Sequence, residues 1–233
     1  SLRLPIRSVR WSGSGRSYVL PLDDPARIAA PCHRNVTKAR YPALMKNYSR
    51  YAAYFAPRPG PLAEFADAWL GWSATDGYEV AHPDIPGLPA PVSALTATPR
   101  KYGFHGTLKP PFRIVEGRGR QDLEAAVHAL AQTLHPVVMP SLRLARLGGF
   151  LALVPEGDTT DLAAFAATVV KELDGFRAPA SEAELARRRA PGLTPAQEAH
   201  LRAWGYPYVL SEFKFHLTLT GKLPTDDAER VRA

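Results

Sequence analysis

Cysteine and long apolar runs are nearly absent from this chain of 233 residues. The single cysteine, Cys32, cannot form an internal disulfide, and it excludes a metal cluster held by several thiolates. No apolar run reaches the roughly 18 residues that a membrane-spanning helix needs. With 45% hydrophobic residues, the composition is typical of a globular protein in a reducing, cytoplasmic setting with no membrane partner.

An excess of charge is also missing from most of the chain. The net charge of +7 arises within residues 1–47, which hold nine of the 29 basic and two of the 22 acidic residues. The remaining 20 basic and 20 acidic residues cancel. Because a long nucleic-acid footprint needs a basic surface on the domain itself, RNA is an alternative partner that the charge does not favour.

Residues 1–44 are rich in arginine, proline, serine and glycine and show no regular period. We therefore expect a basic N-terminal arm over 1–44 and a single domain over 45–233. Two interpretations of the arm stay open. Either Met45 is the natural start of the protein, or residues 1–44 are a genuine extension that packs on the domain.

Regular patterns begin at residue 49. Strands and helices interleave without strict alternation, which is typical of an α+β fold with antiparallel sheets. Two capping boxes, Ser181 with Glu184 and Thr194 with Gln197, predict the starts of two short helices. The other expected elements are strands at 51–55 and 213–219, a hairpin over 142–154 turning at Gly148-Gly149, helices at 61–70, 123–134 and 162–173, a helix at the C-terminus, and a long loop at 82–99.

One five-residue string occurs twice, as Phe104-His105-Gly106-Thr107-Leu108 and as Phe215-His216-Leu217-Thr218-Leu219. In an extended strand, the histidine and threonine of each copy share one face, and the apolar residues share the other. A single copy could be an ordinary amphipathic strand with its polar face in solvent. Two matching copies have no packing reason to repeat the polar set, so they predict a site.

These side chains suit a phosphate diester. Two imidazoles can act as acid and base in an in-line displacement, and either one can be the base. The hydroxyls of Thr107 and Thr218 can hold the non-bridging oxygens. Neither motif has the spacing of a common zinc site, so we expect chemistry without a metal or a cofactor. By strand parity, three lysines share the polar faces and are further candidates for phosphate binding: Lys101, Lys109 and Lys214. By the same parity Tyr102 faces the core, unless a bulge at Gly103 turns it.

The paired His-x-Thr strings resemble the signature of the 2H phosphoesterase superfamily, which includes cyclic nucleotide phosphodiesterases and proteins like 2′-5′ RNA ligase. The surrounding residues are similar to a DUF1045-like branch linked to phosphonate metabolism. This resemblance extends over about residues 48–223 and is carried by the segments 50–55, 100–112, 184–189, 192–195 and 204–208.

The resemblance implies a bilobal fold, in which two antiparallel-sheet lobes flanked by helices surround a central cleft with one motif per lobe. Carried over by position, His105 and His216 are the catalytic pair, and Thr107 and Thr218 bind phosphate. The implied function is a metal-independent phosphodiesterase for a small cyclic phosphate or related diester, linked to phosphonate metabolism. The alternatives are an RNA-end ligase or cyclic phosphodiesterase, and a phosphate-ligand binding protein without catalysis.

Overall fold

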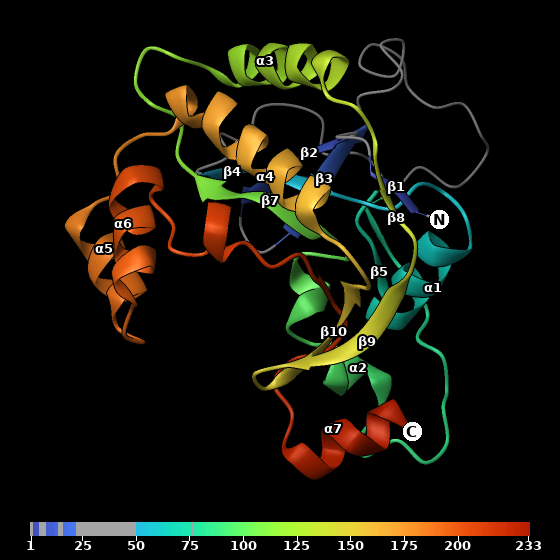
Figure 1. Ribbon diagram of the computed structural model, residues 1–233. Coiled ribbons are helices and arrows are strands. Elements are labelled where there is room, and N and C mark those ends of the chain that lie inside the picture. Colours follow the sequence, from blue (N-terminus) through green and yellow to red (C-terminus); the bar gives the residue numbers. More distant parts are fainter. Residues whose placement is uncertain (1, 5–7, 14–15, 22–49, 76) are drawn as a thin grey trace.

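The computed structural model describes residues 2–4, 8–13, 16–21, 50–75 and 77–233. Its main element is a seven-stranded sheet in which all neighbouring strands are antiparallel (Figure 1). The strand order is β3 (Arg16–Pro21), β2 (Ser8–Gly13), β4 (Arg50–Phe55), β7 (Gly106–Phe112), β11 (Leu217–Thr218), β10 (Phe150–Pro155) and β9 (Leu142–Leu147). Two small antiparallel sheets pair β1 (Leu2–Leu4) with β8 (Val137–Met139), and β5 (Trp72–Ser73) with β6 (Tyr78–Glu79). The expected α+β class with antiparallel sheets is confirmed.

The helices interleave with these strands along the chain. Figure 1 shows α3 and α4 on one side of the sheet, with α5 and α6 beyond one end of it. In the described part of the chain, the α-helices are α1 (Pro61–Leu70), α2 (Val92–Leu95), α3 (Arg120–Thr133), α4 (Thr160–Glu172), α5 (Glu182–Arg189), α6 (Pro195–Trp204) and α7 (Thr225–Arg232). This part of the chain also forms the short 3₁₀ turns η2 (Pro99–Lys101), η3 (Asp174–Phe176) and η4 (Leu210–Glu212). Among the described residues, no helix is long and apolar enough to cross a membrane.

The hydrophobic core lies between the sheet and the apolar stripes of α1, α3 and α4. Val127 of α3 and Val169 of α4 belong to the same buried cluster as Leu108 and Leu217, which come from the two motif copies. Burial of each large apolar side chain stabilises the fold by about 1.5–3 kcal/mol. The apolar residues of both motifs are thus on the core face, as their alternation predicts.

The elements that were predicted from short-range sequence signals are present in the structure. The predicted helix at 61–70 is α1, and the predicted hairpin is β9 and β10 with Gly148-Gly149 between them. Both capping boxes form: the Ser181 hydroxyl accepts from the Glu184 N–H, and the Thr194 hydroxyl accepts from the Gln197 N–H. The expected loop at 82–99 also contains α2.

The two motif strands are shorter than expected. The second pairs only at Leu217–Thr218, because η4 and an irregular segment precede it. The first begins only at Gly106, because Pro99 starts a 3₁₀ turn and Gly103 takes a left-handed φ of 69°. Each histidine therefore lies immediately before its strand, at the point where the backbone changes direction.

The segment expected to be a basic arm contains β1, β2 and β3, and β2 pairs with β4 in the main sheet. Residues 22–49, which include Cys32 and Met45, lie outside the described residues. The division at residue 44 and the two interpretations of the arm stay predictions.

A buried glycine allows the two motif strands to meet. Gly106 and Leu217 face each other across β7 and β11, and a Cβ on Gly106 would lie 2.3 Å from two ring carbons of Phe215. We expect Gly106→Ala to lower the free energy of unfolding by about 1–3 kcal/mol, the usual cost of overpacking a core. Urea denaturation measures this loss, and Phe215→Leu in the same chain should recover part of it. An unchanged stability of Gly106→Ala would contradict this packing.

Glu184 anchors the start of α5 to the sheet. Its carboxylate accepts a hydrogen bond from the Ser181 N–H at 3.0 Å, and it pairs with Arg50 at the start of β4 and with Arg113 after β7. The pKa of Glu184 is lowered to about 2. The hydrogen bond from Ser181 is the largest cause, and the hydrogen bond and charge of Arg113 and the charge of Arg50 follow. α5 is thus attached at the end of β7 opposite the motif.

A depressed carboxylate pKa makes a stabilising contribution that is complete above the unfolded-state pKa and is lost as the pH falls toward the folded-state value. We therefore expect Glu184→Gln to be less stable than the wild type at pH 6, with a smaller difference at pH 3. Urea unfolding at both pH values measures the two differences. Glu182→Gln, at an exposed position of the same helix, is the control. A constant difference would show that the negative charge of Glu184 does not contribute to stability.

Candidate functional site

The two motif copies lie side by side in the centre of the sheet. Leu217 is paired with Gly106, and one further residue in each direction places His216 beside Thr107 and Thr218 beside His105. Directly opposed residues of antiparallel strands have Cβ atoms about 4.5–5.5 Å apart. The register therefore brings two histidines and two threonines together on one face, with each histidine next to the threonine of the other copy.

Both imidazoles are held by the same backbone contact. His105 Nδ1 lies 2.9 Å from the carbonyl oxygen of Gly103, and His216 Nδ1 lies 2.8 Å from that of Lys214. Because a carbonyl oxygen only accepts, Nδ1 must carry the hydrogen and donate it in each ring. In the neutral ring Nε2 then has a lone pair and can take up a proton, and in the charged ring it can release one. The two copies thus share one tautomer.

Aromatic rings fix the orientation of both histidines, but differently. The His105 ring stacks on Tyr54 with centroids 3.9 Å apart and meets the edge of Tyr102 at 5.4 Å. The His216 ring lies 5.8 Å from that of Phe150. Burial raises the pKa of Tyr102, so its hydroxyl keeps its proton at neutral pH. His105 is therefore enclosed by two tyrosines, and His216 lies against one phenylalanine.

The four motif residues on this face are half-buried, in contrast to their fully buried neighbours on the core face. Within the described part of the chain, the hydroxyls of Thr107 and Thr218 have no hydrogen-bond partner in the protein. By contrast Thr220, two residues beyond Thr218, is 1% exposed, accepts from the Leu151 N–H and donates to the Gly221 carbonyl. The two motif hydroxyls are therefore able to bond a ligand, whereas Thr220 is occupied.

The three candidate lysines occupy different places. Lys214 and Lys101 are exposed, and Lys101 belongs to the η2 turn rather than to a strand. The carbonyl group of Lys214 is the partner of His216, so its backbone contributes to the site whatever its ammonium group does.

The expectation that Lys109 shares a face with Thr107 is wrong, because the strand register shifts between them. Thr107 is paired with Tyr54, but Lys109 is paired with Ala53. Adjacent residues of β4 face opposite ways, so this bulge turns Lys109 to the core face. Its side chain is 2% exposed, and Nζ bonds the Val170 carbonyl at 3.0 Å and the Asp174 carboxylate at 3.1 Å.

Sequence reasoning did not identify Tyr54, Tyr102 or Phe150 as neighbours of the histidines. Tyr102 was expected in the core unless Gly103 turned the chain, and the positive φ of Gly103 marks that turn. Tyr54 belongs to an apolar strand that lacks alternation, so no local signal separates its face from that of Phe55. Phe150 follows the hairpin turn and reaches His216 only through the pairing of β10 with β11.

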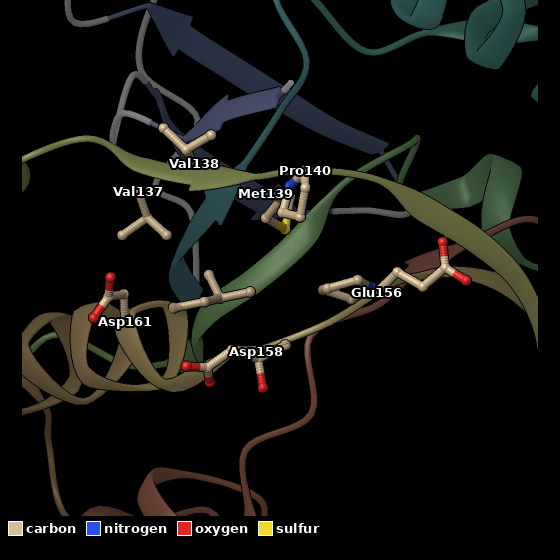
Figure 2. A pocket seen from close by; sticks show the side chains of 10 residues that line it. Val137, Val138, Met139, Pro140, Glu156, Asp158 and Asp161 are labelled. Carbon is tan, nitrogen blue, oxygen red and sulfur yellow. The ribbon is translucent and has the colours of Figure 1, made fainter.

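A pocket of about 130 Å³ lies elsewhere, between β8, the end of β10 and the start of α4 (Figure 2). Its lining includes three carboxylates and no basic side chain: Val137, Val138, Met139, Pro140, Pro155, Glu156, Asp158, Thr159, Asp161 and Leu162. Carboxylates repel phosphate, so this pocket does not suit the expected ligand. Among the described residues, no three His, Cys, Asp or Glu side chains are grouped to hold a metal ion.

Comparison with known proteins gives the family. Residues 107–233, more than half of the chain, match the model of a protein family of unknown function, DUF1045. The chain therefore belongs to this family, and the matched region includes Thr107 and the whole second motif.

Two curated relatives carry the same name, ribose 1,5-bisphosphate phosphokinase PhnN. The protein from Janthinobacterium sp. (strain Marseille) is 39% identical over 188 residues, which cover 80% of this chain and 42% of the relative. The protein from Laribacter hongkongensis (strain HLHK9) is 38% identical over 183 residues, which cover 76% and 41%. The chain thus spans about two fifths of the length of these relatives. No solved structure matches the chain.

The buried ion pair behind the site makes a prediction about stability. Asp174 also bonds Arg177 at 2.8 and 2.9 Å, so it keeps a partner when Lys109 is replaced. Burial lowers the pKa of Lys109, and the charge of Asp174 opposes that effect. We expect Asp174→Asn to cost about 3 kcal/mol or more of unfolding free energy, because it leaves a buried cation without its counter-charge. Lys109→Met should be close to neutral.

Urea denaturation of both variants measures this difference. Equal losses of unfolding free energy would show that each charge is equally unfavourable without the other. The bond from Arg177 would then not compensate Asp174 for the loss of Lys109. A larger loss for Lys109→Met would contradict the assignment of Lys109 to the core.

Proposed function

We propose that this protein is a metal-independent phosphodiesterase that hydrolyses a small cyclic phosphate or a related diester, with His105 and His216 as its acid–base pair. The observation that carries the proposal is the matched backbone bond at Nδ1 of both rings. A packing role does not require two imidazoles with the same tautomer on neighbouring strands. This arrangement suits acid–base catalysis from two sides of one phosphorus, because each ring then keeps Nε2 for the reacting group.

The proposed reaction follows from this placement. One Nε2 removes a proton from water as its oxygen bonds to phosphorus. The bond from phosphorus to the leaving oxygen breaks, and the second imidazole gives that oxygen a proton. Thr107 and Thr218 donate hydrogen bonds to the non-bridging oxygens, where negative charge increases. The product is a phosphate monoester on the same molecule, and each proton transfer contributes about 10²–10⁴-fold. The two halves of the sheet, which meet at β7 and β11, would be the two lobes of the 2H type.

The name of the relatives supports a ribose phosphate as the substrate class. Opening a cyclic phosphate that bridges C1 and C2 of ribose 5-phosphate, with cleavage at O2, yields ribose 1,5-bisphosphate, the compound in that name. The 233 residues contain no G-x-x-x-x-G-K-[ST] phosphate loop, so we assign no phosphokinase activity to this part. The link to phosphonate metabolism is part of this proposal.

Two alternative functions predict different behaviour toward phosphate ligands. An RNA-end enzyme of the same type would act on RNA with a terminal cyclic phosphate and bind it in a salt-dependent way, which the balanced charge beyond residue 47 does not favour. A binding protein without catalysis would hold phosphate ligands and turn over none of them.

We expect His105→Ala and His216→Ala each to lower kcat by at least about 100-fold. The purified chain is incubated in EDTA with 2′,3′-cyclic nucleotides, ribose 1,2-cyclic phosphate with and without a 5-phosphate, and an RNA with a terminal cyclic phosphate. Circular dichroism verifies the fold of each variant. His128→Ala, at an exposed position of α3, is the matched control and should retain full activity.

Full activity of a chain lacking both motif histidines would refute the proposal. Turnover of the RNA alone would favour the RNA-end enzyme, and binding without turnover would favour the ligand-binding protein.

A further inference from the structure

We infer that Arg143 binds a second phosphate group of the substrate, apart from the phosphate between the two motifs. The inference rests on the proposed function and goes beyond it, because it makes the enzyme selective for a small molecule that carries both a cyclic phosphate and a phosphate monoester.

The sheet register places Arg143 in the same row as His216. Val154 is paired with Arg143, and the β10–β11 pairing, continued by one residue, places Val154 beside His216. The row on this face therefore reads Thr107, His216, Val154, Arg143. Leu142 and Leu144, the neighbours of Arg143 in β9, pack against the hydrophobic core. The Arg143 side chain consequently leaves the sheet on the histidine face.

Two strand spacings separate Arg143 from His216, about 10 Å between Cα atoms. An extended arginine side chain can cover much of that distance above the small side chain of Val154. Its guanidinium would then approach the reacting phosphate without displacing it from the histidines and threonines. A second anion on the same small molecule, about one sugar ring away, would lie within its reach.

The charge of Arg143 is available for such a group. Arg143 is exposed, and within the described part of the chain it has no ion pair or hydrogen bond through its side chain. The same-face carboxylate one row further along is Glu156, which accepts from the Ser141 hydroxyl at 2.8 Å. Guanidinium groups bind phosphate through two parallel hydrogen bonds, which neither lysine nor a neutral side chain reproduces.

Toward β4 the row has a different character. There the residue beside Thr107 is Tyr54, whose ring stacks on His105. The site is therefore aromatic toward β4 and cationic toward β9. A substrate with one phosphate monoester would bind in a single direction, with that group toward β9, even though the two motifs themselves are nearly symmetric.

The test compares two substrates that differ only in the second phosphate: adenosine 2′,3′-cyclic phosphate with and without a 5′-phosphate, and the corresponding ribose 1,2-cyclic phosphates. We expect the wild type to prefer the phosphorylated member of a pair in kcat/KM. Arg143→Gln should lower that preference about 10-fold to 100-fold, mainly through KM, as expected for a lost charged hydrogen bond. The preference should also weaken at high ionic strength. Arg202→Gln, 73% exposed on α6, is the control and should change nothing.

A second measurement separates this inference from the proposed catalysis. Isothermal titration calorimetry gives the Kd of each member of a pair for the wild type and for Arg143→Gln, whether or not turnover occurs. Selective loss of affinity without turnover would support the Arg143 site and refute the catalysis. Three results would overturn the inference. They are turnover with an equal loss of affinity for both members in Arg143→Gln, a wild type without a preference, and binding of neither member. Arg143 would then be a solvated charge on an edge strand.

Discussion

The pairing of Leu217 with Gly106 is the constraint on which the site depends. It joins β7 to β11, and it sets the register that places each histidine beside the threonine of the other copy. The repeated string differs at the middle position for a physical reason. On the core face, one copy supplies a leucine and the other a glycine, and the ring of Phe215 fills the space that the glycine leaves. A side chain at position 106 would overlap this ring.

The catalytic proposal depends on a local backbone feature rather than on long-range charge. Each imidazole is bonded to a carbonyl group two residues earlier in the chain, so the segment before each strand sets both the direction of the ring and its tautomer. The surroundings of the two rings then differ, with tyrosines around His105 and Phe150 against His216. The backbone hydrogen bond of the ring is therefore repeated between the copies, whereas its aromatic contacts are not.

The sequence predicted the features that short-range chemistry determines. The capping residues placed α5 and α6, the glycine pair placed the hairpin, and alternation correctly assigned Phe104, Leu108, Phe215, Leu217 and Leu219 to the core face. It could not predict the burial of Lys109, because the bulge that turns this residue depends on the pairing of β7 with β4. Tyr54 and Arg143 were missed for the same reason. Their relation to the histidines exists only through strand order, which one strand's pattern does not contain.

The position of β9 at the edge of the sheet has a consequence for association between molecules. An edge strand exposes backbone groups that can pair with a strand of another copy. Arg143 and Arg146 are three residues apart in β9 and therefore project from opposite faces. If two copies aligned along this edge, like charges would approach on both sides of the new pair, which is unfavourable. The charges of the strand that carries Arg143 thus act against sheet extension along this edge.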